Sequence, residues 1–135
     1  MTDFTASSEY VTDTMALVLW LEKRRLSSLV RTIFAGTETG EVTLYIPAIV
    51  FAEILYLSEK RKISIAFETM SHYLNTHKHY KECPLSLSII QESSTITDIK
   101  ELHDRLIAGT AKFMNLPLIT NDPVIEASGS VKTVW

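Results

Sequence analysis

The chain has 135 residues, of which 46% are hydrophobic, and a formal net charge of −3. This length corresponds to one compact domain, and the apolar fraction is large enough for a core that needs no disulfide or structural metal. The single cysteine, Cys83, excludes an internal disulfide, and the acidic balance argues against a simple nucleic-acid coat protein, which would be basic.

The chain begins with a polar, acidic stretch that lacks the features of a secretory signal. The strictly apolar run from Met15 to Leu21 is far too short to span a bilayer. We therefore expect a cytoplasmic protein with no membrane partner, in which residues 1–8 form a loose tail and residues 9–135 form one domain.

Short strands and helices alternate along this domain. Strands are expected at residues 10–12, 42–46, 80–83, 118–120 and 131–134. Helices are expected at residues 15–24, 27–35, 47–60, 65–74, 86–94, 102–114 and 123–127. Asp13 or Thr14 can cap the first helix, Gly36 or Gly40 can close the second, and Pro47 suits the first turn of the third. This alternation predicts an α/β fold with a central, mostly parallel sheet.

Two aspartates come shortly after expected strands. Asp13 directly follows the first strand, and Asp122 lies two residues after Thr120, which ends a later strand. In open parallel sheets, ligands bind beyond the carboxyl ends of the strands, where the strand order reverses. We therefore expect both carboxylates at one edge of the sheet. Taken singly, each aspartate has a simpler explanation as the cap of the helix behind it.

Glu53 is the only charged residue between Tyr45 and Leu57. Apolar residues lie one helical turn below and above it, so a carboxylate buried there is costly unless it is paired or bound to a cation. Two alternatives stay open: the side chain could reach solvent at the rim of its helix, or it could pair with an arginine.

Asp104 lies at the start of a helix that continues through the small residues 108–111. The helix dipole favours a negative charge in the first turn, which is a sufficient structural reason for this residue. Gly109 costs about 1 kcal/mol relative to alanine inside a helix. We therefore expect a close backbone approach at Gly109, with the helix packed tightly against the sheet.

Together the acids form a pattern that none of them shows alone. Oxygen ligands without His or Cys select Mg²⁺ or Mn²⁺ rather than zinc. Crowded carboxylates repel one another unless a cation lies among them, so at least one pKa should be raised, with Glu53 the first candidate because of its apolar flanks. Such a site can position water for in-line attack on a phosphodiester. The candidate catalytic and metal-binding residues are Asp13, Glu53, Asp104 and Asp122.

Four segments, residues 11–21, 46–55, 102–111 and 116–122, resemble the PIN-domain family and, within it, the toxin half of VapBC toxin–antitoxin pairs. The resemblance implies a three-layer α/β/α fold with a central mostly parallel sheet, Mg²⁺- or Mn²⁺-dependent cleavage of RNA, frequent homodimers and inhibition by a cognate antitoxin. The four candidate acids match the family's acidic positions, and Thr120 matches its usual hydroxyl residue near the site. Gly109 departs from the family pattern, which usually has alanine there.

Other polar residues are candidates for substrate contact or for positioning the acids. They include Thr14, Thr120, Arg105 and, with less support, His103. Neighbouring residues of a helix do not face each other, so Arg105 should point away from Asp104 and hold a carboxylate or carbonyl with its planar guanidinium. The alternative is that Arg105 clamps an RNA phosphate.

Basic residues occur in short groups: residues 23–25 with Arg31, residues 60–62, and Lys78 with Lys81. Cations at solvated helix ends are common, and this explanation is preferred for each group. The groups are also candidate phosphate contacts. Excess apolar surface on the helices that contain Leu17 and Ile49 favours a homodimer or a bound partner helix.

The sequence therefore favours a metal-dependent endoribonuclease that is the toxin of a type II toxin–antitoxin system. Two alternative hypotheses remain. One is a PIN-like nuclease of RNA processing that is not a toxin, and the other is a catalytically idle PIN-like module that binds an antitoxin or RNA.

Overall fold

The computed structural model describes residues 8–135, so the expected tail, residues 1–8, lies outside the described part except for its last residue. Along the described chain the elements are β1 (Glu9–Thr12), α1 (Thr14–Leu21), α2 (Ser28–Thr39), β2 (Thr43–Pro47), α3 (Ala48–Glu59), α4 (Phe67–Asn75), β3 (Tyr80–Cys83), α5 (Leu87–Ser94), α6 (Leu102–Met114), β4 (Leu118–Ile119), α7 (Pro123–Ser128) and β5 (Thr133–Val134). None of these helices is long and apolar enough to cross a membrane.

The strands form one sheet in the order β3-β2-β1-β4-β5, and every pair of neighbours is parallel. Strand β1 is central, with Val11 in register with Tyr45 of β2 on one side and with Leu118 of β4 on the other. The expected α/β class with a parallel sheet is confirmed.

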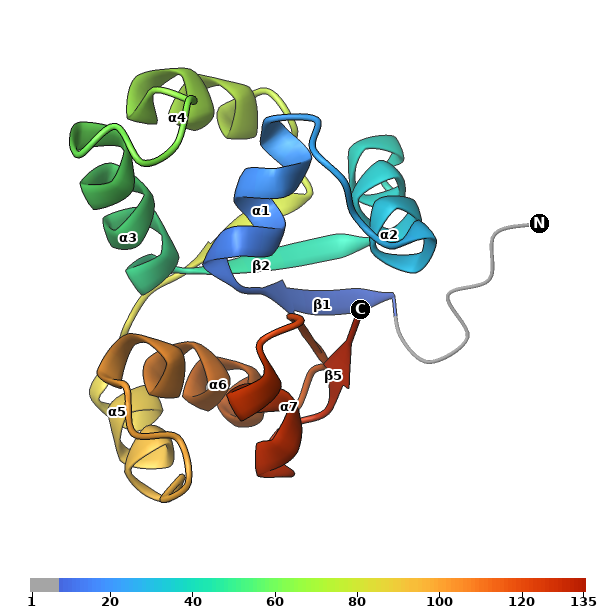
Figure 1. Cartoon of the computed structure of the whole chain (residues 1–135). Helices are drawn as coiled ribbons and strands as arrows, with labels where there is room; N and C mark the ends of the chain where they lie inside the picture. Colours follow the sequence, from blue (N-terminus) through green and yellow to red (C-terminus); the bar gives the residue numbers. More distant parts are fainter. Residues whose placement is uncertain (1–7) are drawn as a thin grey trace.

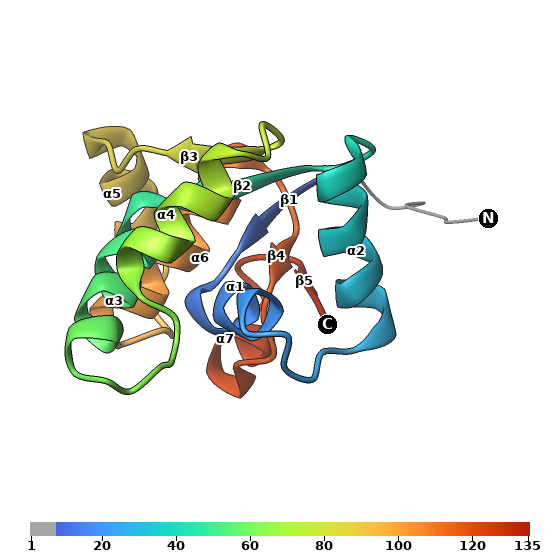
Figure 2. The same cartoon turned by 90° about the horizontal axis from the view of Figure 1, so that it is seen from above.

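Helices cover both faces of the sheet and complete the three layers. Helices α1 to α4 lie on one face, and α5, α6 and α7 lie on the other (Figure 1). Seen from above, α1 lies between α4 and α2 (Figure 2). The strand residues Val11, Leu44 and Leu118 are fully buried between these layers, and Leu17 and Ile107 pack into the same core from opposite helix layers.

The order of the strands reverses at β1. From β1 the chain builds outward through β2 to β3, then returns to place β4 on the other side of β1 and β5 beyond it. The connections that leave β1 and β4 therefore diverge to opposite faces. A crevice at the carboxyl ends of these two strands follows from this topology, and it is where α/β proteins bind ligands.

Among the element boundaries that differ from those expected, three have a clear structural reason. Helix α1 ends at Leu21 instead of residue 24, because Lys23 adopts a left-handed backbone with a φ of 57°. Helix α2 runs past Gly36 and ends at Gly40, whose φ of 90° suits glycine. Pro47 does not lie in the first turn of α3 but ends β2, where it pairs in register with Cys83.

Helices α5 and α6 approach each other closely at Gly109, where a side chain would not fit. A Cβ atom on Gly109 would lie 2.7 Å from Ser93 Cβ and 2.9 Å from Ser93 Cα. The expected close approach is confirmed, but the neighbour is α5 and not the sheet. Helix α6 thus packs on α5 and also contacts β1 of the sheet.

Candidate active site

A pocket of about 470 Å³ lies at the carboxyl edge of the sheet, at the point where the strand order reverses. The four acids predicted from the sequence all line it, although they come from four separate segments of the chain. Its lining residues are Asp13, Thr14, Met15, Glu53, Leu57, Asp104, Ile107, Asn121, Asp122 and Pro123. The predicted convergence of the acids is therefore present in the structure.

Asp13 links β1 to α1 and is almost fully buried, with 8% of its surface exposed. Its Oδ1 accepts a hydrogen bond of 2.9 Å from the Ala16 N–H and so caps α1. The pKa of Asp13 is raised to about 6. Burial is the main cause and the negative charges of Asp122 and Glu53 also raise the pKa, against the lowering effect of hydrogen bonds from Thr120 and Ala16. Asp13 is therefore both the cap of α1 and part of the pocket lining.

Thr120 connects the two aspartates that follow β1 and β4. Its fully buried hydroxyl accepts a hydrogen bond of 3.1 Å from the Asp122 N–H and donates one to Asp13. Asp122 in turn caps α7, because its Oδ1 accepts hydrogen bonds from the N–H groups of Val124 at 2.8 Å and Ile125 at 3.2 Å. The N–H groups of α7 thus fix the Asp122 carboxylate, and the Thr120 hydroxyl fixes that of Asp13.

Glu53 enters the pocket from the second turn of α3. Its Oε1 accepts a hydrogen bond from the Thr14 hydroxyl, and its Oε2 lies 3.2 Å from His103 Nδ1. The side chain is 24% exposed. Desolvation therefore acts most strongly on Asp13, not on Glu53 as the apolar flanks suggested. Of the two alternatives left open, the arginine partner is wrong: among residues 8–135, Glu53 contacts a threonine and a histidine.

Asp104 is the third residue of α6 and lines the same pocket as the other three acids. Its N–H donates a hydrogen bond of 2.8 Å to Glu101 Oε1, the cap of this helix. The pKa of Asp104 is raised to about 6, mainly by burial and in addition by the charges of Asp122, Glu101, Glu53 and Asp13. The pKa values of Asp13 and Asp104 thus record mutual repulsion among the acids in addition to burial.

Arg105 points away from the pocket, as expected from its place next to Asp104. Its Nε donates a hydrogen bond of 3.0 Å to the Ser93 carbonyl, and its Nη2 lies 3.4 Å from the Ser94 carbonyl. The guanidinium therefore binds the last carbonyl groups of α5. This contact, together with the Gly109 approach, joins α5 to the helix that presents Asp104.

Sequence reasoning missed Asn121 and gave little weight to His103. Asn121 lines the pocket from the connection after β4, and the edge argument that found Asp122 could have found it too. His103 was predictable only with the fold in hand, because its contact with Glu53 joins α3 to α6 across the pocket.

The oxygen-rich lining fits a hard divalent cation. Within residues 8–135, no three His, Cys, Asp or Glu side chains already stand in a ready ligand cluster. Asp13 and Asp122 use their Oδ1 atoms as helix caps, and Glu53 is bonded to Thr14 and His103. Even so, a divalent cation would relieve the repulsion that helps to raise the pKa values of Asp13 and Asp104. The oxygen donors and their negative charge therefore fit such a cation.

Comparison with known proteins places this architecture. A family model described as the PIN domain matches residues 10–128. No curated protein sequence matches the chain.

Solved structures share the fold at low sequence identity. VapBC2 from Rickettsia felis, solved with a DNA fragment from its promoter, is similar at 20% identity with a TM-score of 0.71, covering 94% of this chain and 98% of that one. DNA-bound VapBC from Salmonella typhimurium is similar at 17% identity with a TM-score of 0.69, covering 95% of this chain and 98% of that one. A toxin–antitoxin complex from Klebsiella pneumoniae is similar at 18% identity with a TM-score of 0.66, covering 93% of this chain and 96% of that one. The family model covers most of the chain, so the protein belongs to the PIN domain family.

Proposed function

We propose that this protein is a metal-dependent endoribonuclease, with residues 9–135 as its nuclease domain. The observation that carries the proposal is the convergence of four carboxylates in one pocket, two of them with pKa values raised to about 6 by burial and by their acidic neighbours. The residues proposed to hold Mg²⁺ or Mn²⁺ and to take part in catalysis are Asp13, Glu53, Asp104 and Asp122.

A divalent cation bound by these acids would polarise a phosphodiester and activate water for its hydrolysis. The chain's own residues prepare the pocket for this task. The Ala16 N–H and the Thr120 hydroxyl fix the Asp13 carboxylate, and the Thr14 hydroxyl fixes that of Glu53. Thr14 and Thr120 are therefore assigned positioning roles. Arg105 is assigned a structural role, since its guanidinium is engaged by the end of α5.

The partners proposed for this function are an RNA substrate, a cognate antitoxin and a second copy of the chain. Support for a toxin role comes from the solved neighbours, which include the toxin–antitoxin and VapBC complexes named above. Support for protein partners comes from exposed apolar side chains, including Tyr56 on α3, Leu87 on α5 and Phe113 on α6. Helix α1 contributes less than expected, because Leu17 is fully buried. The proposed place of action is the cytoplasm.

Cleavage of a labelled single-stranded RNA, with Mg²⁺ or with EDTA, tests the proposal. We expect cleavage with Mg²⁺ only, and a loss of at least about 100-fold in Glu53→Gln, because the variant removes a charge that holds the cation. Glutamine can still accept the Thr14 hydrogen bond, so the fold should be retained. The matched control is Glu59→Gln, which removes an exposed carboxylate from the same helix.

Two results would contradict the proposal. One is wild-type protein that cleaves no RNA at any divalent-ion concentration, which would favour an idle binding module. The other is a Glu53→Gln protein that is folded and cleaves as fast as the Glu59→Gln control. If the protein cleaves RNA but its expression does not arrest growth, the result supports the nuclease activity and contradicts the toxin role.

A further inference from the structure

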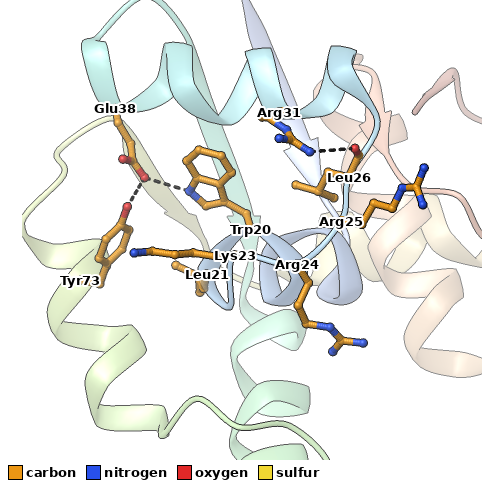
Figure 3. A pocket seen from close by; sticks show the side chains of 9 residues that line it. All are labelled: Trp20, Leu21, Lys23, Arg24, Arg25, Leu26, Arg31, Glu38 and Tyr73. Atoms are coloured by element: carbon orange, nitrogen blue, oxygen red, sulfur yellow. Dashed lines mark hydrogen bonds between the residues drawn. The ribbon is translucent and has the colours of Figure 1, made fainter.

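A second pocket, of about 480 Å³, lies beyond the far end of α1 from the acidic pocket. Four of its lining residues are cationic: Lys23, Arg24, Arg25 and Arg31. The other lining residues are Trp20, Leu21, Leu26, Glu38 and Tyr73. In Figure 3, Glu38 and Tyr73 lie on one side of the pocket, and Arg24, Arg25 and Arg31 lie on the other.

One oxygen of the carboxylate in this pocket, Glu38 Oε2, accepts hydrogen bonds from three donors of the protein. Trp20 Nε1 donates a hydrogen bond of 2.9 Å to Glu38 Oε2, the Tyr80 hydroxyl donates one of 2.7 Å, and the Tyr73 hydroxyl donates a third. Burial alone would raise the pKa of Glu38, but these hydrogen bonds hold it below its usual value. Glu38 therefore serves to join α2, α1, α4 and β3. It stays ionised, so its single charge offsets only one of the four cations that line the pocket.

Two of the four cations lack a partner within the described part of the chain. Arg24 pairs with Glu22 at 3.3 Å, and Arg31 donates to the Leu26 carbonyl at 3.4 Å. For the exposed side chains of Lys23 and Arg25, no hydrogen bond or ion pair exists among residues 8–135. Their charges are thus available to an external anion.

The fold also brings a second basic stretch to this region. Glu22, the residue before Lys23, accepts hydrogen bonds from the backbone N–H groups of Ser64 at 2.6 Å and Ile65 at 2.9 Å. These bonds tie the turn after α1 to the loop after α3, which contains the basic residues 60–62. Two basic groups that are far apart in the sequence therefore become neighbours on a protein whose net charge is negative.

We propose that this cationic pocket binds a phosphodiester of the RNA strand that is cleaved in the acidic pocket. The inference rests on the proposed ribonuclease function. Helix α1 runs from Asp13 at its cap to the start of the cationic turn, a span of about 12 Å at 1.5 Å per residue. One single strand can therefore occupy both pockets.

Charge and chemistry support this pairing of sites. The acidic pocket alone repels a polyanion, so attraction must come from cations placed nearby. The ring of Trp20, stacked on Phe34 with centroids 5.3 Å apart, gives the pocket a rigid aromatic wall. Aromatic walls beside cations are typical of single-strand nucleic-acid sites, where bases stack and phosphates pair with cations.

The test measures binding separately from cleavage. A short fluorescent oligouridylate is titrated with protein in EDTA over a series of salt concentrations, and anisotropy gives the affinity. For Lys23→Gln/Arg25→Gln we expect at least about fivefold weaker binding, and a slope of log affinity against log salt reduced by about 1.4, which is about 0.7 for each lost phosphate contact. The matched control, Lys78→Gln/Lys81→Gln, removes two exposed lysines elsewhere and should stay within about twofold of the wild type.

An unchanged affinity and salt slope in the folded pocket variant overturns the inference, as does the absence of RNA binding by the wild type. If melting shows that the double variant is unfolded, Arg25→Gln carries the test, since this exposed side chain has no partner in the described part of the chain. A fluorescent hexaglutamate peptide provides a second arm. Loss of peptide binding with unchanged RNA binding would assign the pocket to an acidic polypeptide instead.

Cleavage with Mg²⁺ separates this inference from the function on which it rests. A wild type that binds RNA through the pocket but never cleaves it contradicts the ribonuclease proposal alone. A wild type that cleaves RNA, with a pocket variant that binds as tightly as the wild type, contradicts the pocket alone.

Discussion

Asp13 and Asp122 each serve the fold and the pocket with one side chain. Both residues cap helices with Oδ1, and both line the acidic pocket. The two explanations that compete when the sequence is considered alone are therefore compatible. Asparagine is as good a helix cap as aspartate, so Asp→Asn variants remove the charge while keeping the local structure.

The pKa of Asp13 leads to a pH-dependent prediction. In the folded, metal-free protein burial raises it to about 6, whereas an unfolded aspartate titrates near about 3.9. Between these values only the folded state binds the proton, so stability falls as pH rises from about 4 to about 6 and stays lower above that. Asp13→Asn should therefore be more stable than wild type by about 3 kcal/mol at neutral pH, with little difference near pH 4.

Urea unfolding in EDTA across this pH range measures the effect. The wild type is its own control, because all other titrating groups are shared with the variant. If the free energies of unfolding of the two proteins follow parallel pH profiles, with no gain for Asp13→Asn at neutral pH, then burial does not destabilise the charged form of Asp13.

At the scale of elements, the pairing of α5 with α6 depends on the missing side chain of Gly109. Alanine would improve helix propensity by about 1 kcal/mol, but its Cβ would lie 2.7 Å from Ser93 Cβ and 2.9 Å from the Ser93 backbone. Because backbone must move, we expect Gly109→Ala to destabilise the protein by about 1 to 3 kcal/mol. Thermal unfolding with Gly109→Ala/Ser93→Gly is the control, since the double variant should recover part of the loss. Equal or higher stability of Gly109→Ala would show that the helices separate easily.

Glu22 joins the turn after α1 to the loop before α4. Burial would raise its pKa, but hydrogen bonds from the Ile65 and Ser64 N–H groups and the nearby Arg24 hold it below the usual value. A lowered pKa means that this contribution is present above the pKa of the unfolded state and is lost as pH falls through the folded value.

Glu22→Ala should therefore lower stability at neutral pH by about 1 to 3 kcal/mol, because two backbone donors lose a charged acceptor. The loss should shrink in acid. Arg24→Ala keeps both backbone bonds and should cost no more than about 1 kcal/mol, as for an exposed ion pair. Chemical denaturation gives the free energy of unfolding of both variants. A larger loss of stability in Arg24→Ala than in Glu22→Ala would contradict the importance given to the two backbone hydrogen bonds.

At the scale of the whole molecule, the features that depend only on the order of elements along the chain are predictable from the sequence. In a parallel sheet each strand must end at the same edge, so acids placed directly after strands, such as Asp13 and Asp122, can be assigned to one site without a structure. The parallel class is predictable in the same way from the alternation of strands and helices.

Features that depend on packing between distant segments were not predictable. The end of α2 was ambiguous because Gly36 is tolerated inside the helix, and only Gly40 adopts the left-handed backbone. The hydrogen-bond partners of Glu38 and Glu22 come from segments dozens of positions away, with no local pattern that marks them. The cationic pocket depends on these contacts, so its basic residues looked like ordinary solvated helix ends.

The central claim is that the acidic pocket holds a divalent cation, and calorimetric titration of Mn²⁺ at neutral pH tests it most directly. We expect wild-type protein to bind Mn²⁺ and Asp104→Asn to bind it at least about tenfold more weakly, because the variant loses a charged ligand. Asp98→Asn is the matched control and should bind as the wild type does, since Asp98 is exposed, contacts Ser128 and lies outside the pocket. Equal Mn²⁺ affinity for Asp104→Asn and Asp98→Asn, or no binding by the wild type at millimolar Mn²⁺, would contradict the account.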